Sequence, residues 1–240
     1  DFLGFLSSWE SSHWSGKLLF YIKKENFKMK KKFFIVIAIF FSAIYFCQTN
    51  NLSKEIDAIY TTFNESNKTA KDKILGKYSN ANIQEVEKTQ AYINDYALFL
   101  KEKEKHQSDK MSELKKLLEK TKENNPFVGS IPFNNQNNSE YETNFDLVQS
   151  QVINVRNDLV QYFNDDYIDA PYGSTLRTKI NLVLDSDGKF KNVTCAGENQ
   201  EMNLYTSLLI YSLNKYIKPI MSENKIMPAN FAIPLTLKFE

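Results

Sequence analysis

Residues 175–196 read TLRTKINLVLDSDGKFKNVTCA, and this stretch decides the fold of the C-terminal part of the chain. From Leu176 to Leu184 apolar side chains alternate with polar ones such as Arg177 and Lys179, which is typical of a strand that buries one face. The segment DSDG at residues 185–188 predicts a hairpin turn, because its glycine adopts a positive φ without strain. The chain then returns as a second strand at residues 189–196.

Two helices and a last strand surround this hairpin. A helical stripe of apolar residues covers 148–163, and another covers 202–217. Clean alternation at the C-terminus predicts a final strand whose buried face carries Phe231, Ile233, Leu235, Leu237 and Phe239. Between the second helix and this strand, Pro219 and Pro228 predict a loop.

The middle of the chain is helical and heavily charged. A first helix is expected from Leu52 to about Leu75, a break at residues 76–80, and a second helix at 82–122 with apolar residues at heptad spacing. We predict either a two-helix hairpin, folded on itself or on the next domain, or an intermolecular coiled coil that makes a homo-oligomer. Residues 126–144 are rich in asparagine with prolines and a glycine, so they predict a linker between a helical region at 48–125 and a domain at 145–240.

The front of the chain has the features of an export signal. Three lysines follow Met29, and an apolar run of 15 residues extends from Phe33 to Cys47. That length suits a signal-peptide core and is short for a membrane span. We therefore expect residues 29–47 to be a signal peptide, residues 1–28 to lie upstream of the true start, and the protein to be periplasmic. A short membrane anchor and a lipidated Cys47 remain alternatives.

Composition excludes several function classes. The 240 residues have a net charge of +1, which argues against a nucleic-acid partner, and two cysteines cannot build a disulfide scaffold. The charge is uneven, since residues 126–170 carry one basic and seven acidic residues. Asp185 and Asp187 lack the further ligands of a calcium loop. Neither the acids at 165–169 nor Cys195 has a nearby histidine, so we expect no enzyme and no cofactor.

Several elements together resemble a known family. The hairpin motif ending in Asp185-Ser186-Asp187-Gly188, the Gly197-x-Asn199 turn, Pro219 after the helix and the closing Phe231-x-x-Pro234-Leu235-Thr236 are similar to the TonB C-terminal domain, in the versions found singly in Bacteroidota. The resemblance covers residues 150–240. It implies an α+β fold in which an α-β-β-α-β domain with a three-stranded antiparallel sheet follows the helical region.

The resemblance also implies a function, which is to bind an extended peptide by strand addition to a sheet edge. The partner would be an outer-membrane transporter or another protein of the cell envelope. Because Pro234 cannot donate a ladder hydrogen bond, its strand should be the edge strand. The expected partner-binding residues are Phe231, Ala232, Ile233, Pro234, Leu235, Thr236 and Lys238. The alternative is a coiled-coil adaptor of the envelope whose C-terminal domain is passive.

Overall fold

The computed structural model describes residues 51–133, 141–213 and 215–239. The expectations for residues 1–47, including the signal peptide and Cys47, lie outside the described residues. The described chain is α+β, and it contains two three-stranded sheets whose ladders are antiparallel. None of its helices is both long enough and apolar enough to cross a bilayer.

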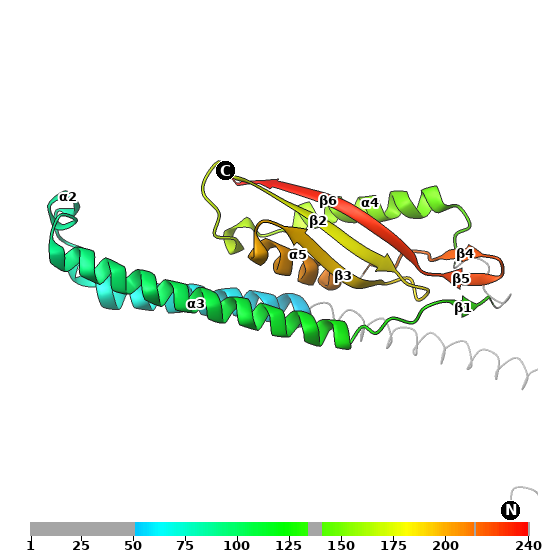
Figure 1. The fold of residues 1–240 in the computed structure, drawn as a ribbon, viewed down its shortest axis with the longest axis horizontal. Helices are drawn as coiled ribbons and strands as arrows, with labels where there is room; N and C mark the ends of the chain where they lie inside the picture. The colour runs from blue at the N-terminus through cyan, green and yellow to red at the C-terminus, as the bar shows by residue number, and fades with distance from the viewer. Residues whose placement is uncertain (1–50, 134–140, 214, 240) are drawn as a thin grey trace, which may run out of the picture. The chain divides into compact units, whose positions relative to one another are not determined.

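The larger sheet has the strand order β3-β2-β6, with β2 at Thr175–Leu184, β3 at Phe190–Gly197 and β6 at Ala229–Lys238. Two helices pack on one face of it: α5 (Gln200–Leu213) on β3 and α4 (Phe145–Tyr162) on β6. The other face is open to solvent along most of its length. The larger sheet and its two helices follow one another in the chain as helix, strand, strand, helix, strand, but two short strands that were not predicted are inserted between α5 and β6 (Figure 1).

Two antiparallel helices form a hairpin below this sheet. One is helical over residues 51–75, and the other is α3 (Gln90–Glu123). Contacts between them run in opposite directions, because Glu55 bonds to Lys120 while Asn67 bonds to His106. The predicted break is present as a 3-10 turn, η1 (Gly76–Tyr78). The predicted second helix is interrupted, since α2 (Ile83–Val86) ends before α3, whose N-cap Thr89 accepts from the Tyr92 N–H.

The hairpin shares one hydrophobic core with the C-terminal elements. Leu114 and Leu118 of α3 and Ile56 of the first helix belong to the same buried cluster as Val152 and Leu208. This corrects the predicted boundary at 126–144, which separates no two cores among the described residues. The composition of the linker signalled a turn-rich segment, but composition does not report which helix faces pack together. Of the two readings left open, the hairpin folded on the next domain is present.

The smaller sheet has the order β1-β5-β4. It was not predicted, because Pro219 and Pro228 indicated a loop and the composition of residues 126–144 indicated a linker. Its strands are β1 (Ile131–Pro132), β4 (Ile220–Ser222) and β5 (Lys225–Met227). The predicted loop between the prolines is thus a hairpin, and its turn residues Glu223 and Asn224 both have positive φ, of 50° and 59°. That is the geometry of a two-residue hairpin turn. Strands of two or three residues are too short for alternation to reveal.

A buried ion pair joins the helical hairpin to α5. Lys110 of α3 pairs with Glu201 in the first turn of α5, and their side chains are 1% and 5% exposed. The Gln107 amide donates to the same carboxylate at 2.9 Å. The Lys110 Nζ also lies 3.8 Å from the Phe63 ring centre. Burial lowers the pKa of Lys110, and the adjacent Glu201 carboxylate opposes that shift. One polar contact therefore holds three helices.

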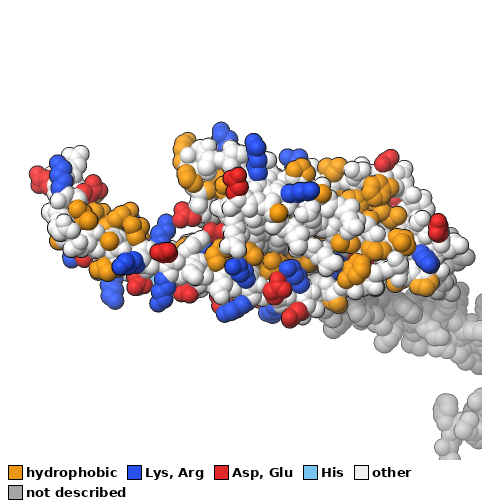
Figure 2. Space-filling model, viewed as in Figure 1, with side chains coloured by type: hydrophobic (Ala, Val, Ile, Leu, Met, Phe, Trp, Pro, Cys, Tyr) orange, Lys and Arg blue, Asp and Glu red, His pale blue; other side chains and the backbone are white. Residues whose placement is uncertain are grey.

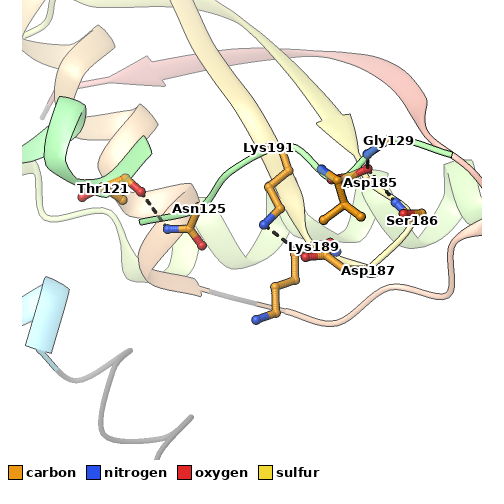
Figure 3. Close-up of polar contacts among 9 residues, drawn as sticks. Thr121, Asn125, Gly129, Asp185, Ser186, Asp187, Lys189 and Lys191 are labelled. Carbon is orange, nitrogen blue, oxygen red and sulfur yellow. Dashed lines mark hydrogen bonds and ion pairs between the residues drawn. The ribbon is translucent and has the colours of Figure 1, made fainter. Parts of the chain in front are cut away.

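The hairpin turn between β2 and β3 holds two other segments, and Figure 3 shows its contact with the linker at Gly129. Asp185 is fully buried, and its carboxylate accepts from the N–H groups of Val128 at 2.6 Å, Gly129 at 3.0 Å and Ser186 at 2.8 Å. On another side, the Gly188 carbonyl accepts from the Ile217 N–H at 2.9 Å. A Cβ on Gly188 would lie 2.8 Å from the Ile217 carbonyl oxygen. The predicted turn is thus also a junction for the linker and for the segment after α5.

We predict that removing either partner of the buried pair destabilises the whole described fold. Lys110→Met or Glu201→Leu leaves one buried charge without its partner, so each should lower the free energy of unfolding by about 3–5 kcal/mol. The double variant should lose less than the sum of the two. Urea unfolding followed by circular dichroism measures this. Losses below about 1 kcal/mol in both single variants would show that the pair contributes no specific contact.

A second prediction concerns the buried turn carboxylate. Asp185→Ala leaves three backbone N–H groups without their acceptor, so it should lower the free energy of unfolding by about 3 kcal/mol. It should also speed proteolysis within residues 124–133, because the linker loses its attachment. Asp72→Ala, at an exposed acid of the helical hairpin, is the control. An Asp185→Ala protein that matches this control in both measurements contradicts the role assigned to the turn.

Candidate functional site

The expected partner-binding strand, β6, lies at one edge of the larger sheet. It pairs with β2 from Leu184↔Ala229 to Thr175↔Lys238 without a break in register. Because the sheet order ends at β6, no other described strand pairs with its outer side. The expectation that the last strand is an edge strand is confirmed. What could bind there is decided by which groups point outward.

The backbone of β6 has its even-numbered residues on the open side. The Phe239 N–H donates to the Ser174 carbonyl at 3.0 Å, directed toward β2. Successive residues of a strand direct their N–H and C=O to opposite sides of it. Since the register has no shift, residues 231, 233, 235 and 237 bond to β2. Ala232, Thr236 and Lys238 therefore offer N–H and C=O groups to the solvent side.

Pro234 belongs to this outward set. Its ring nitrogen points to the open edge, so β2 loses no hydrogen bond and the outer edge lacks one donor. Its carbonyl remains available as an acceptor. An incoming strand could thus bond on both sides of Pro234 and would miss one bond at its centre. The register with β2 thus fixes the orientation of Pro234, which the sequence alone does not give.

The side chains of the predicted set divide into two groups. Ile233 and Leu235 are buried at 4% and 1% exposure, and Phe231 stacks on Phe145 of α4 with ring centres 5.7 Å apart. Ile233 and Leu235 fix the strand to the core and are not available to a partner, whereas Phe231 is half-buried. Ala232, Pro234, Thr236 and Lys238 are exposed on the solvent face of the sheet. The site is therefore a backbone edge flanked by small side chains.

The opposite edge of the sheet is less regular. In β3 the pairing with β2 shifts between Asn181 and Val183, and Asn192 has a φ of 50°. Such a bulge interrupts the row of outward N–H and C=O groups that strand addition needs. The register of β6 has no shift over its ten residues, and its outward row lacks only the N–H of Pro234. Of the two edges, β6 is the better template.

Sequence reasoning placed Arg177 and Lys179 on the solvent face of β2 but did not include them in the site. Their partners in β6 are Thr236 and Pro234, so they lie one strand inward from the open edge. Within the part of the chain that the structure describes, neither side chain has an ion-pair or hydrogen-bond partner. The signal that could have found them is the absence of aspartate and glutamate from all three strands of this sheet.

Other candidate groups have structural partners. Asp187 pairs with Lys191 at 3.1 Å, and Asp169 pairs with Lys103 at 2.9 Å. Burial raises the pKa of the Cys195 thiol to about 11, so it is protonated at neutral pH and a poor nucleophile. The described ranges contain no cluster of three histidine, cysteine or acidic residues arranged to hold a metal ion.

No family model, no curated protein and no solved structure matches this chain.

Proposed function

We propose that this protein is a periplasmic protein-interaction module, which binds an extended segment of an envelope protein by adding it as a strand to β6. The observation that carries the proposal is the open edge of β6, whose register with β2 has no shift and which directs N–H and C=O groups outward on both sides of Pro234. An incoming backbone finds hydrogen-bond partners there without any rearrangement of the sheet.

Two features of the sequence support the same function. Apart from the inserted β4 and β5, the elements from α4 to β6 follow the order implied by the resemblance to the TonB C-terminal domain, in which the last strand accepts the partner peptide. The basic and apolar stretch at residues 29–47 is typical of an export signal, which would bring the protein to the compartment of such partners. An outer-membrane transporter is the partner that we propose to test first.

We expect strand addition to depend on the N–H group of Thr236. Thr236→Pro removes that outward donor and leaves the bonds between β2 and β6 in place, so it should reduce binding at least tenfold with little change in stability. Thr236→Ala keeps the N–H and should bind as the unaltered protein does. The measurement is the amide spectrum of the isotope-labelled chain, titrated with N-terminal peptides of the host's outer-membrane transporters.

In that titration the shifts should concentrate in residues 229–238. Shifts centred on α5, with β6 silent, would rule out strand addition as the binding mode. Equal binding by the proline and alanine variants would do the same, because only the former lacks the donor.

A second candidate function is self-association through the helical hairpin. Residues 91–100 of α3 read AYINDYALFL, apolar all round except at Asn94 and Asp95. A helix with this composition is normally buried. Here its large side chains are exposed, at 49% for Ile93, 52% for Leu98 and 45% for Leu100. Figure 2 shows this apolar patch near the end of the hairpin that carries α2.

This second candidate predicts an oligomer that depends on the patch. Ile93→Asp with Leu100→Asp places charge on the exposed apolar surface, so it should convert an oligomer to a monomer in sedimentation velocity runs. Lys71→Asp with Lys115→Asp, at exposed positions elsewhere on the hairpin, should leave the oligomer intact. A chain that is already monomeric at high micromolar concentration excludes the adaptor function in this form.

A further inference from the structure

The solvent face beside the β6 edge carries basic side chains, and one exposed acid, Glu198, directly follows the last residue of β3. The strands β2, β3 and β6 contain Arg177, Lys179, Lys191 and Lys238 and no acidic residue. Lys191 is buried and paired with Asp187. Arg177 and Lys179 are exposed, and they have neither hydrogen-bond nor ion-pair partners among the described residues. Figure 2 shows Lys and Arg side chains over this part of the sheet.

These two cations lie on the same face of one strand, two residues apart. Side chains at such spacing are neighbours on a sheet, and like charges there repel. The cost is small at an exposed site, and neither cation forms an ion pair within the described residues. An anionic group bound near them would remove that repulsion.

The geometry of the edge places the bound strand within their reach. Arg177 pairs with Thr236 and Lys179 with Pro234 at non-hydrogen-bonded positions of the β2–β6 ladder. An added strand would place residues opposite Thr236 and Pro234, and their side chains would lie on the same solvent face. They would be two strand spacings from β2, or about 9.6 Å.

The side chains between them leave the path open. Ala232, Pro234 and Thr236 are small, so the long stems of Arg177 and Lys179 can extend over them toward the edge. A glutamate or aspartate of the added strand extends from the other side. The small side chains of β6 therefore leave room for the two cations to reach the acidic side chains of a bound strand.

We propose that the segment recognised at β6 is an acidic peptide. Its carboxylate side chains occupy every second position and lie on the same solvent face as Arg177 and Lys179. This inference rests on the proposed strand addition and names the chemistry of its partner. A peptide is favoured over a nucleic acid, because the edge offers alternating N–H and C=O groups that match another peptide backbone. The charge would select among extended segments that the backbone alone accepts equally.

The test compares three peptides of equal length, with threonine alternating with glutamate, glutamine or lysine, in titrations of the isotope-labelled full chain. The glutamate peptide should shift the amides of residues 229–238 and bind about tenfold more tightly than the glutamine peptide. That advantage should fall as sodium chloride is raised from 50 to 500 mM, because salt screens exposed charges. The lysine peptide should bind most weakly.

A matched pair of variants isolates the two cations. Arg177→Gln with Lys179→Gln should remove the preference for glutamate and leave the binding of the glutamine peptide unchanged. Lys71→Gln with Lys115→Gln removes the same charge from the helical hairpin and should keep the preference. Loss of preference in both double variants would show that net charge, rather than this face, attracts the peptide, and would overturn the inference.

The outcomes separate this inference from the function on which it rests. If the glutamine peptide shifts β6 as strongly as the glutamate peptide, strand addition stands and acidic recognition is wrong. If no peptide shifts β6, strand addition itself fails for these peptides, and the inference fails with it. If oligothymidylate displaces the glutamate peptide from β6, the face recognises nucleic-acid phosphates and the assignment to a peptide is overturned.

Discussion

The contact between Lys110 and Glu201 is the constraint on which the arrangement of the helices depends. A lysine and a glutamate at 1% and 5% exposure are tolerated only when each neutralises the other. The pair therefore sets the position of α3 along α5, since a shift by one helical turn would bury two unpaired charges. Phe63 and Tyr60 cover the ammonium group from the first helix, so that helix is fixed by the same group.

Tyrosine rings surround the ion pair of Lys110 and Glu201. Burial raises the pKa of Tyr60, and the nearby negative charge of Glu201 adds to that effect. The Tyr60 ring stacks on Tyr167 with centres 4.1 Å apart. Tyr205 from α5 contacts both rings edge-on. An apolar core could slide along such aromatic surfaces, whereas the ion pair admits one alignment. Its contribution is to specify the packing as much as to stabilise it.

Sequence patterns predicted the elements well where each element supplies its own signal. Alternation from Leu176 to Leu184 and from Phe231 to Phe239 marked both long strands and their buried faces. The features that were not predicted depend on contacts between segments that are distant in the sequence. Lys110 is one lysine among many in a charged helix, and nothing near it in sequence marks it as buried beside Glu201. The smaller sheet was not predicted because its strands are only two or three residues long, which is too short for an alternation of apolar and polar residues to repeat.

The candidate site was predicted in part for the same reason. The alternation of β6 and the ring of Pro234 identified an edge strand from local residues alone. The direction of the proline nitrogen depends on the register with β2, and that became visible only through the bond from Phe239 to Ser174. The alternation of β2 places Arg177 and Lys179 on its polar face and says nothing more about them. Their lack of counterions is a property of the whole sheet, and no single strand reveals it.

The orientation of Pro234 also has a consequence for self-assembly. Two copies of this chain that joined their β6 edges would bring two prolines to one ladder and would lose a donor from each. A foreign strand without proline loses only one. Pairing of two β6 edges is therefore less favourable than the addition of a strand without proline. This protects the open edge against edge-to-edge aggregation.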